Sequence, residues 1–356
     1  MRLALERRAQ TTLAMQIASP LIAVALTLVS AVVIFIALGQ DPARALHAYF
    51  ISPVSDAWGL QEVAVKATPL VLIAVGLALC YQSNNWNIGA EGQLLMGAMA
   101  GTWVAIATHG TPNGPWVLPA MLVAGALGGA AFAAIPAALK TRFGANEILT
   151  SLMLVYVAEL FMDWLVRGPW RDPQGFNMPQ TVVFEPEATV PLLSDGRLNI
   201  GTPIMLVVVA LAAFMMVRTL KGFEIRLVGE APKAARFAGF SAKRLTWLVF
   251  AISGALAGLA GILEAAGTVK QLQPNLSPGY GFTAIIVAFL GRLNPIGCLI
   301  AGVFLAITFI GGENAQIMLK LPLDVTRVFQ GLLLFYVLAC DSFLLYRVRL
   351  IRGAAA

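Results

Sequence analysis

One polar stretch lies between two long apolar segments of the chain, the stretch "YQSNNWNIGAEGQLLMGAMAG" at residues 81–101. Its hydroxyl, amide and carboxyl side chains belong to Ser83, Asn84, Asn85, Asn87, Glu91 and Gln93. Amide side chains both donate and accept hydrogen bonds, which suits sugar hydroxyls or the edges of nucleobases. The same groups can instead cap helix ends and hold a break between two helices together. The stretch therefore predicts either a contact with a polar solute or a structural helix break.

The chain offers little else for chemistry. Its two histidines, His47 and His109, stand alone, and neither lies in an H-E-x-x-H motif. The three cysteines, Cys80, Cys298 and Cys340, lie in or beside apolar runs and are interpreted as packing residues. No G-x-x-x-x-G-K-[ST] motif occurs, so the chain is not expected to cradle a nucleotide phosphate. We predict no catalytic residue, no metal site and no cofactor bound by this chain.

The composition indicates a protein that lies in lipid. Of the 356 residues, 59% are hydrophobic and 12% are charged, with a mean hydropathy of +0.80. A soluble domain carries about 25% charged residues, and one core cannot absorb this much apolar surface. The net charge of +6 comes without a dense Lys/Arg cluster interleaved with aromatics, so nucleic acid is not an expected partner. We predict an all-α polytopic membrane protein.

Ten apolar segments are expected to form transmembrane or half-spanning helices. A span needs about 20 apolar residues. The segments lie near 17–39, 61–81, 92–108, 116–138, 146–166, 202–219, 245–266, 281–291, 295–312 and 325–346. The one at 281–291 is too short to span, which predicts a half-helix surrounded by protein or a watery cavity. The basic N-terminus before the first long run predicts an uncleaved first helix.

The distribution of Lys and Arg predicts the orientation, because cytoplasmic loops are enriched in both. With a cytoplasmic N-terminus, 16 of the 24 basic residues fall inside and 8 fall outside. Both termini are then cytoplasmic, and residues 1–356 form a single transmembrane domain. The connection at 167–201 is predicted to be an ordered external loop, and the one at 220–244 a cytoplasmic loop.

Close packing of helices in lipid requires small residues at the contact. Three of the predicted segments carry glycines at four-residue spacing: Gly97 and Gly101, Gly125 and Gly129, Gly254 and Gly258. This spacing predicts that these segments pack closely against their neighbours.

Carboxylates in the predicted spans need an explanation, since a charge at the bilayer centre costs about 2.5–3.5 kcal/mol on insertion scales. Glu159 and Asp163 lie toward the external end of a span and are expected to reach headgroups or water. Glu264 also lies near an external end, where solvation or capping is expected. Glu147 begins a helix, where the dipole favours negative charge. Glu91 belongs to the Gly-interrupted polar stretch and is the strongest pathway candidate.

Two regions hold the candidate solute contacts. The first surrounds the polar stretch and comprises Asn84, Asn85, Trp86, Asn87, Glu91, Gln93, Asn146 and Glu147. Broken helices at membrane depth are where transporters build their sites. The second region is "KQLQPNLSPGYGF" at 270–282, where Gln273, Asn275 and Tyr280 could line an external mouth.

The stretch "VGEAPKAARFAGFSAKR" at 228–244 predicts one short cytoplasmic helix. Pro232 suits a first helical turn, Glu230 lies at the same end, where the dipole favours it, and Gly239 permits a left-handed helix end. Ala234, Ala235 and Ala238 form a small apolar face. Such a helix can dock into a groove on a cytoplasmic partner, or it can lie on the lipid surface.

"GEAPKAARFAGFSAKR" resembles the coupling-helix segment of permeases of ATP-binding cassette (ABC) importers. "NIGAEGQLLMGA" at 87–98 and "ANEILTSLMLVYVA" at 145–158 are similar to the permease branch that serves nucleosides, simple sugars and branched-chain amino acids. The nucleoside-type permeases are the best match, over about residues 60 to 345. The resemblance assigns the ATPase contact to Glu230, Ala231, Pro232, Ala234, Ala235, Arg236, Ala238 and Gly239.

The resemblance also implies an assembly. Its parts are a second homologous permease, in a heterodimer or a homodimer, ATPase subunits that use ATP-Mg, and an external binding protein or lipoprotein. The location is the bacterial cytoplasmic (inner) membrane. The expected cargo is a nucleoside, with a simple sugar or another small polar solute as the alternative. An ion-coupled secondary transporter using Glu91 is a weaker reading, and an intramembrane enzyme lacks a nucleophile–base or metal constellation.

Overall fold

The computed structural model describes residues 2–7, 13–111, 114–322 and 324–351, and these are helical except for one strand pair and the connections. The chain divides into two compact units, one of Met1–Pro53 with Thr308–Ala356 and one of Val54–Ile307. Helix α12 (Pro295–Leu319) contributes residues to both units. The prediction of a single transmembrane domain over 1–356 stays a prediction.

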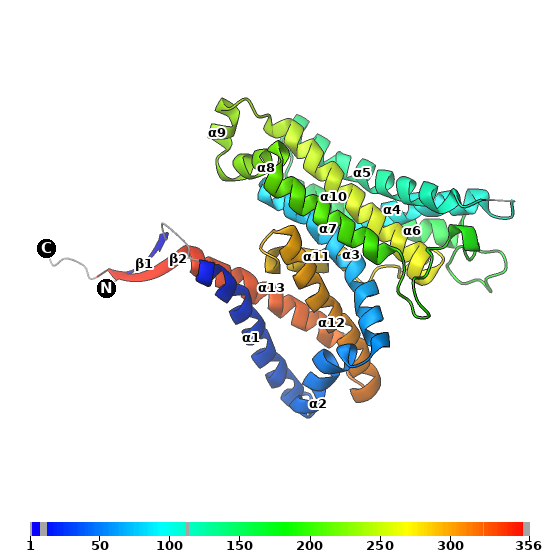
Figure 1. Ribbon diagram of the computed structural model, residues 1–356, viewed down its shortest axis with the longest axis horizontal. Helices are drawn as coiled ribbons and strands as arrows, with labels where there is room; N and C mark the ends of the chain where they lie inside the picture. Colours follow the sequence, from blue (N-terminus) through cyan, green and yellow to red (C-terminus); the bar gives the residue numbers. More distant parts are fainter. Residues whose placement is uncertain (1, 8–12, 112–113, 323, 352–356) are drawn as a thin grey trace. The chain divides into compact units, whose positions relative to one another are not determined.

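The larger unit is a bundle of long helices with short helices at its ends (Figure 1). Its helices are α3 (Ala57–Gln82), α4 (Ala90–Thr108), α5 (Val117–Phe143), α6 (Glu147–Arg167), α7 (Gly201–Arg218), α8 (Leu220–Glu230), α9 (Pro232–Phe237), α10 (Ala242–Leu263) and α11 (Tyr280–Leu290). A 3₁₀ turn covers Pro186–Ala188, and a π-helical segment, Glu264–Val269, continues α10. Helix α3 is the most enclosed of the candidate spans, with 89% of its apolar window buried.

Each of the ten predicted segments overlaps one helix of the structure. Within the described residues, seven helices are long and apolar enough to cross a membrane: Ala18–Ala37, Ala57–Gln82, Val117–Phe143, Glu147–Arg167, Gly201–Arg218, Ala242–Val269 and Pro295–Leu319. The chain is therefore a multi-pass helical membrane protein. The short segment predicted near 281–291 is confirmed as the 11-residue helix α11.

Helices α4, α5 and α10 pack through their glycines. A Cβ atom added to Gly97 would lie 2.1 Å from Cα of Gly258, and one on Gly129 would lie 2.1 Å from the carbonyl oxygen of Gly254. A Cβ on Gly258 would lie 2.2 Å from the carbonyl oxygen of Gly125. No larger side chain fits at these contacts, so the predicted close packing is confirmed.

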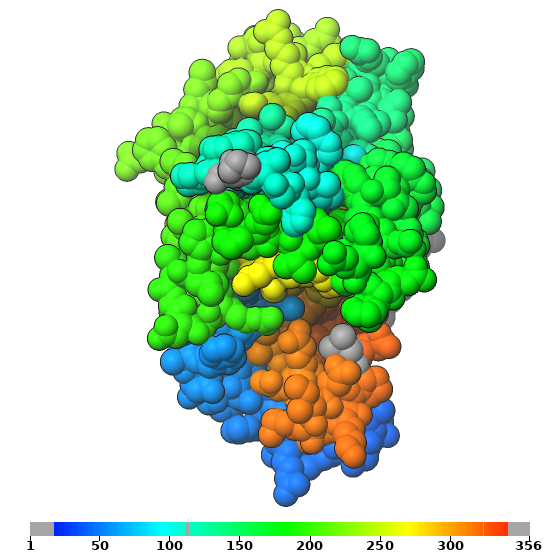
Figure 2. Space-filling model, turned by 90° about the vertical axis from the view of Figure 1, so that its right-hand side faces the viewer, coloured from blue at the N-terminus to red at the C-terminus, as the bar shows by residue number. Residues whose placement is uncertain are grey.

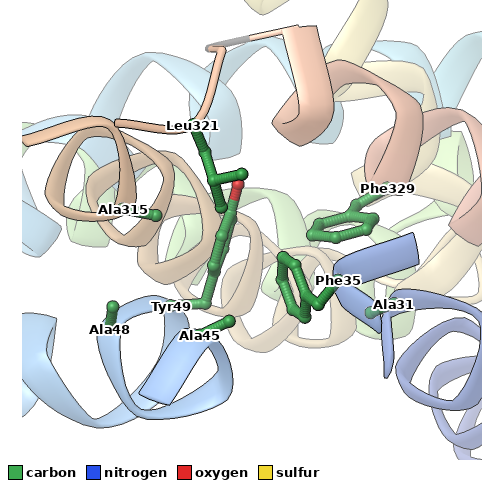
Figure 3. Close-up of a cluster of buried hydrophobic side chains, with 8 residues drawn as sticks. All are labelled: Ala31, Phe35, Ala45, Ala48, Tyr49, Ala315, Leu321 and Phe329. Carbon is green, nitrogen blue, oxygen red and sulfur yellow. The ribbon is translucent and has the colours of Figure 1, made fainter. Parts of the chain in front are cut away.

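The smaller unit is built on α1 (Leu13–Ala37), α2 (Pro42–Leu46), a π-helical turn (His47–Ile51), a 3₁₀ turn (Ser52–Val54) and α13 (Asp324–Leu345). Its core holds Phe35, Tyr49 and Phe329, whose ring centroids lie 5.2 to 5.5 Å apart. Figure 3 shows these rings turned toward one another, with Leu321 beside Tyr49. The Tyr49 hydroxyl also lies 3.0 Å from Oγ1 of Thr326.

The ends of the chain form a strand pair that the all-α prediction did not include. Strand β1 (Arg2–Arg7) runs antiparallel to β2 (Tyr346–Ile351), with Arg2 opposite Ile351. Both strands alternate apolar and charged residues in part, a period of two that suits a strand better than a helix. The pairing brings the two ends of the chain side by side.

The short helix predicted within 228–244 is confirmed as α9, which begins at Pro232, and a second helix, α8, precedes it in the 220–244 loop. Thr219 caps α8 by accepting a hydrogen bond from the Gly222 amide. Helix α8 ends before Ala231 because a residue that precedes proline disfavours the helical conformation. The predicted helix end at Gly239 is confirmed by its left-handed φ of 83°.

The 168–200 connection is irregular and is tied to the segment that follows α10. The amide of Thr181 donates to Leu272 O, the amide of Phe184 to Lys270 O and the amide of Val190 to Ala266 O, at 2.9 to 3.1 Å. Figure 1 shows this connection at the end of the unit opposite α8 and α9. In Figure 2, which faces that end, its green atoms flank the yellow atoms near residue 270.

Gly258→Ala is expected to destabilise the protein by about 1–3 kcal/mol or more, because the new methyl group collides with backbone rather than with a side chain that can move. Thermal unfolding of the solubilised protein measures the effect as a fall in Tm. Gly331→Ala in α13 is the matched control, since nothing lies within 4 Å of its added Cβ. Equal Tm values for the two variants would contradict the packing described above.

Candidate functional site

The connection between α3 and α4 lies inside the bundle. Two contacts with α10 show how deep it lies. The Asn85 side chain accepts a hydrogen bond from Thr246 near the start of α10, and the Asn87 side chain contacts Ser253 farther along the same helix. Ser253 lies eleven residues after the first residue of α10, about 16 Å along the helix. The connection thus enters the protein, and α4 begins well below the surface of the bundle. The predicted helix break is confirmed, with α4 starting at Ala90.

Asn87 holds this break together. Its Nδ2 donates to Oε1 of Gln93 at 3.0 Å and lies 3.1 Å from Oγ of Ser253. Its Oδ1 accepts from Nε2 of Gln93 at 3.0 Å and from the Gly89 amide at 3.1 Å. The Tyr81 hydroxyl donates to its backbone carbonyl at 2.9 Å. Asn87 has no exposed surface, and its hydrogen-bonding groups are bound to other residues of the chain. These contacts favour a structural role at the helix break over contact with a solute.

Lys140 joins three helix ends to the same connection. From the last turn of α5, its Nζ donates to Oε1 of Glu147 at 2.5 Å and to Oδ1 of Asn85 at 2.9 Å. Asn85 in turn accepts from Thr246 on α10 at 2.9 Å. Glu147, at the start of α6, also accepts from the Trp86 amide at 3.4 Å. Only 26% of the Lys140 side chain and 14% of the Glu147 side chain are exposed. Because both charges are partly shielded from water, this ion pair contributes more to stability than a surface ion pair does.

Glu91 meets the start of the short helix α11. Its side chain is 4% exposed, and its Oε2 accepts a hydrogen bond from the Gly281 amide. A Cβ on Gly281 would lie 2.3 Å from the backbone nitrogen of Glu91, so only glycine permits this approach. The carboxylate therefore satisfies a free N–H group in the first turn of α11, where the helix dipole favours negative charge.

Tyr280 belongs to a second polar group at the other end of α10. It is fully buried, its hydroxyl donates to Oε1 of Glu264 at 3.4 Å, and Nζ of Lys66 lies 5.6 Å from its ring centroid. Glu264 is 7% exposed and accepts from Thr268 at 3.3 Å. Of the two expectations for Glu264, solvation is contradicted because α10 continues past it as a π-helix and encloses it, whereas its position as the C-cap residue of α10 agrees with capping. Gln273 is partly exposed, so it does not share the enclosure of Tyr280.

The short helix α9 presents a surface different from the predicted one. Ala235 is 2% exposed and faces the protein, while Ala234 is exposed. Phe237, which the sequence analysis did not select, is 94% exposed. Behind α9, a Cβ on Gly229 of α8 would lie 1.9 Å from the carbonyl oxygen of Gln82, the last residue of α3. The α8–α9 region therefore rests directly on the helix that leads into the polar connection.

A groove of about 460 Å³ between α4, α5 and α6 contains none of the predicted residues. Its walls include Met96, Met99, Phe132, Phe161 and Trp170. This lining is almost entirely apolar and offers few hydrogen-bond partners to a hydroxyl-rich solute, so this groove is not a candidate for recognition.

The structure gathers Asn85, Asn87, Gln93 and Glu147 around one connection. Asn84 and Asn146 lie at its exposed edge, where Asn84 accepts from the Trp86 indole at 3.0 Å and Asn146 caps α6. Tyr280 belongs to the separate group at the far end of α10, and Asn275 is exposed nearby. Sequence reasoning missed Lys140 and Ser253, because neither lies near the polar stretch in sequence.

The family of the chain follows from a comparison with protein families. Residues 59–338 match the model described as the permease component of branched-chain amino acid transport systems. The match covers the larger unit almost entirely, including the polar connection and the α8–α9 region. The chain belongs to this permease family. The resemblance seen in the sequence is thereby confirmed.

Curated relatives of this permease are ABC transporter permeases. It is 36% identical to the glucose ABC transporter permease protein of Haloferax volcanii, with 93% of this chain and 89% of the relative covered. It is 29% identical to the guanosine ABC transporter permease protein of Bacillus subtilis, with 94% and 95% covered. It is 28% identical to the nucleoside ABC transporter permease protein of Lactococcus lactis, with 89% of each covered. Such permeases are transporter components rather than enzymes.

Asn87→Ala in this permease is expected to cost about 1–3 kcal/mol of stability, because it leaves the buried Gln93 amide and the Gly89 N–H without partners. The fall in Tm of the solubilised protein measures the loss. Asn275→Ala, at an exposed position, is the control and should leave the Tm unchanged. An unchanged Tm for Asn87→Ala together with reduced uptake would instead assign Asn87 to solute contact.

Proposed function

We propose that this permease is the transmembrane subunit of an ATP-driven importer and forms the pathway for a nucleoside. Family membership and ABC permease relatives support the importer role. The chain contains no Walker-type phosphate loop, so ATP-Mg binds to and is hydrolysed in a separate ATPase subunit. An ion-coupled carrier has no need of an exposed ATPase-docking helix, and the family gives that alternative no support.

The exposed surface of α9 is the observation that carries the coupling role. The helix projects Phe237 with Lys233 and Arg236 beside it, and each of the three is exposed. An exposed aromatic residue with basic neighbours suits an apolar pocket with an acidic rim. We propose that a movement of α9 is passed on to α8, and from there to the end of α3, because Gly229 of α8 packs against Gln82. The ATPase contact therefore centres on the exposed residues of α9 and not on Ala235.

The cargo we propose is a nucleoside, with a simple sugar as the second candidate. The guanosine and nucleoside permeases among the relatives, which cover nearly the whole chain, support the first. The 36% identity to a glucose permease favours the second. Both solutes present several hydroxyl groups, so one polar pathway can serve either class.

The remaining parts of the assembly follow from the proposed role. A second homologous permease completes the pathway, as a heterodimer or as a homodimer. An external binding protein or lipoprotein delivers the solute, and the 168–200 connection, at the end of the bundle opposite α9, supplies a surface for it. The assembly lies in the bacterial inner membrane with both termini cytoplasmic, and the pairing of β1 with β2 supports placing the two termini on the same side.

Among the residues predicted to contact the solute, only those with accessible side chains are proposed to do so. Asn84, Gln273 and Asn275 retain exposed or partly exposed side chains, whereas Asn87, Gln93 and Tyr280 are enclosed. We propose that the enclosed members hold the two helix breaks in place and that the accessible ones meet the solute.

Phe237→Asp is expected to abolish binding of the ATPase subunit and to reduce uptake to background, because a carboxylate would enter an apolar pocket with an acidic rim. Co-purification of the ATPase with the permease and ATP-dependent uptake into vesicles measure the two effects. Phe176→Asp is the control for ATPase binding alone, since Phe176 is 96% exposed on the opposite connection. Retention of ATPase binding and uptake by Phe237→Asp would contradict the coupling role of α9.

The cargo is tested with the wild-type importer, assembled with its ATPase and its binding protein. Nucleosides, pentoses and hexoses are offered as radiolabelled solutes to proteoliposomes, and ATP-dependent accumulation is measured. Accumulation of a nucleoside that excess glucose does not inhibit is the expected result. Accumulation of glucose that excess nucleoside does not inhibit would assign the sugar instead, and uptake without ATP would contradict the importer role.

A further inference from the structure

Glu159 is an exposed carboxylate close to the middle of a candidate membrane span. Helix α6, Glu147–Arg167, has 21 residues, about 30 Å of helix and thus the thickness of the hydrocarbon core. Its central residue is Val157, so Glu159 lies about 3 Å from the midpoint. Among the described residues, no other carboxylate lies so near the middle of its candidate span.

Within the part of the chain that the structure describes, Glu159 has no hydrogen bond or ion pair. Asp163, one turn further along, lies 2.7 Å from Nε of Arg167 in an exposed pair at the end of the helix. Tyr156, one turn before Glu159, has an exposed fraction of 55%. The three positions and Arg167 follow one face of α6 at spacings of three and four residues. The outer half of this face is therefore a polar stripe.

Lipid cannot cover this stripe at low cost. A carboxylate at the centre of a bilayer costs about 2.5–3.5 kcal/mol on insertion scales. Glu159 lies eight residues from the end of α6, about 12 Å along the helix, which is farther than its side chain can reach to the headgroups. Of the two surroundings expected for Glu159, headgroups or water, this geometry favours water. Ionisable groups in spans face a bundle interior or a water-filled cavity.

We propose that the Tyr156–Glu159 face of α6 lines a water-filled translocation pathway, and that the Glu159 carboxylate accepts hydrogen bonds from the hydroxyls of the transported solute. The proposal rests on the proposed function. In a lone chain this face is open, so a second permease subunit supplies the opposite wall.

The chemistry of the face defines the class of solute. A carboxylate accepts hydrogen bonds from hydroxyl and amino groups and repels anions. The Tyr156 ring offers a flat apolar surface to a sugar ring or nucleobase, and its hydroxyl both donates and accepts. The site therefore takes a neutral, hydroxyl-rich solute and disfavours its phosphorylated form.

Other exposed faces of the larger unit serve as a comparison because they suit lipid. Leu127 on α5 and Leu211 on α7 are 64% and 63% exposed and lie near the middle of their candidate spans. Apolar residues surround both in sequence. An exposed face is therefore not by itself evidence of a pathway. The α6 face differs from these two because it carries a carboxylate.

Cysteine labelling of the assembled importer in membranes tests the proposal. Glu159→Cys and Tyr156→Cys are treated with the membrane-impermeant reagent sulfonatoethyl methanethiosulfonate, with Leu127→Cys and Leu211→Cys as lipid-facing controls. We expect labelling at 159 and 156 to be about tenfold or more faster than at the controls, because the reagent attacks a thiolate, which forms in water and not in hydrocarbon. The wild-type chain gives the background from Cys80, Cys298 and Cys340, of which the first two are buried.

Solute is then added to the labelling reaction. A nucleoside or glucose that the wild-type importer transports should slow the labelling at position 159 several-fold and leave the controls unchanged. Labelling at 159 and 156 no faster than at the controls would overturn the inference even if wild-type uptake is normal. Fast labelling at both positions in an importer without ATP-dependent uptake would support the aqueous face and contradict the proposed function instead.

Discussion

Three helix backbones meet without intervening side chains where α4, α5 and α10 pack through Gly97, Gly129 and Gly258. In lipid, apolar side chains gain little by leaving their surroundings, so close backbone packing supplies much of the attraction between helices. The contact also fixes the register of α4 against α10. With that register set, Asn87 comes within 3.1 Å of Ser253, and the first turn of α4 lies deep in the bundle.

A helix that begins at such depth leaves free N–H groups away from water, and the chain must satisfy them itself. Asn87 accepts from the Gly89 amide, and Ser151 of α6 accepts from the Ile88 amide at 3.1 Å. Glu91 performs the same task for the first turn of α11. The polar stretch is thus explained largely by the hydrogen bonds that a helix break requires.

The same stretch is held from two sides. On one side, Gly229 of α8 presses against the last residue of α3. On the other, Lys140 ties the connection to α5 and α6, the helix that carries Glu159. The connection is thereby held between the α8–α9 region and the start of α6.

The sequence by itself determined the class of the protein and much of its element order. Composition and apolar run length indicate a helical membrane protein, since no other solvent accommodates that much apolar surface, and the glycine spacing and "NIGAEGQ" point to close packing, a helix break and the family. Local signals of this kind act between neighbouring residues, so a sequence carries them directly.

Only the tertiary structure decided that Asn87 is enclosed while Glu159 is exposed, that Lys140 closes the connection, and that α9 presents Phe237 rather than Ala235. The direction a side chain faces depends on which helix packs beside it, and residues distant in sequence set that packing.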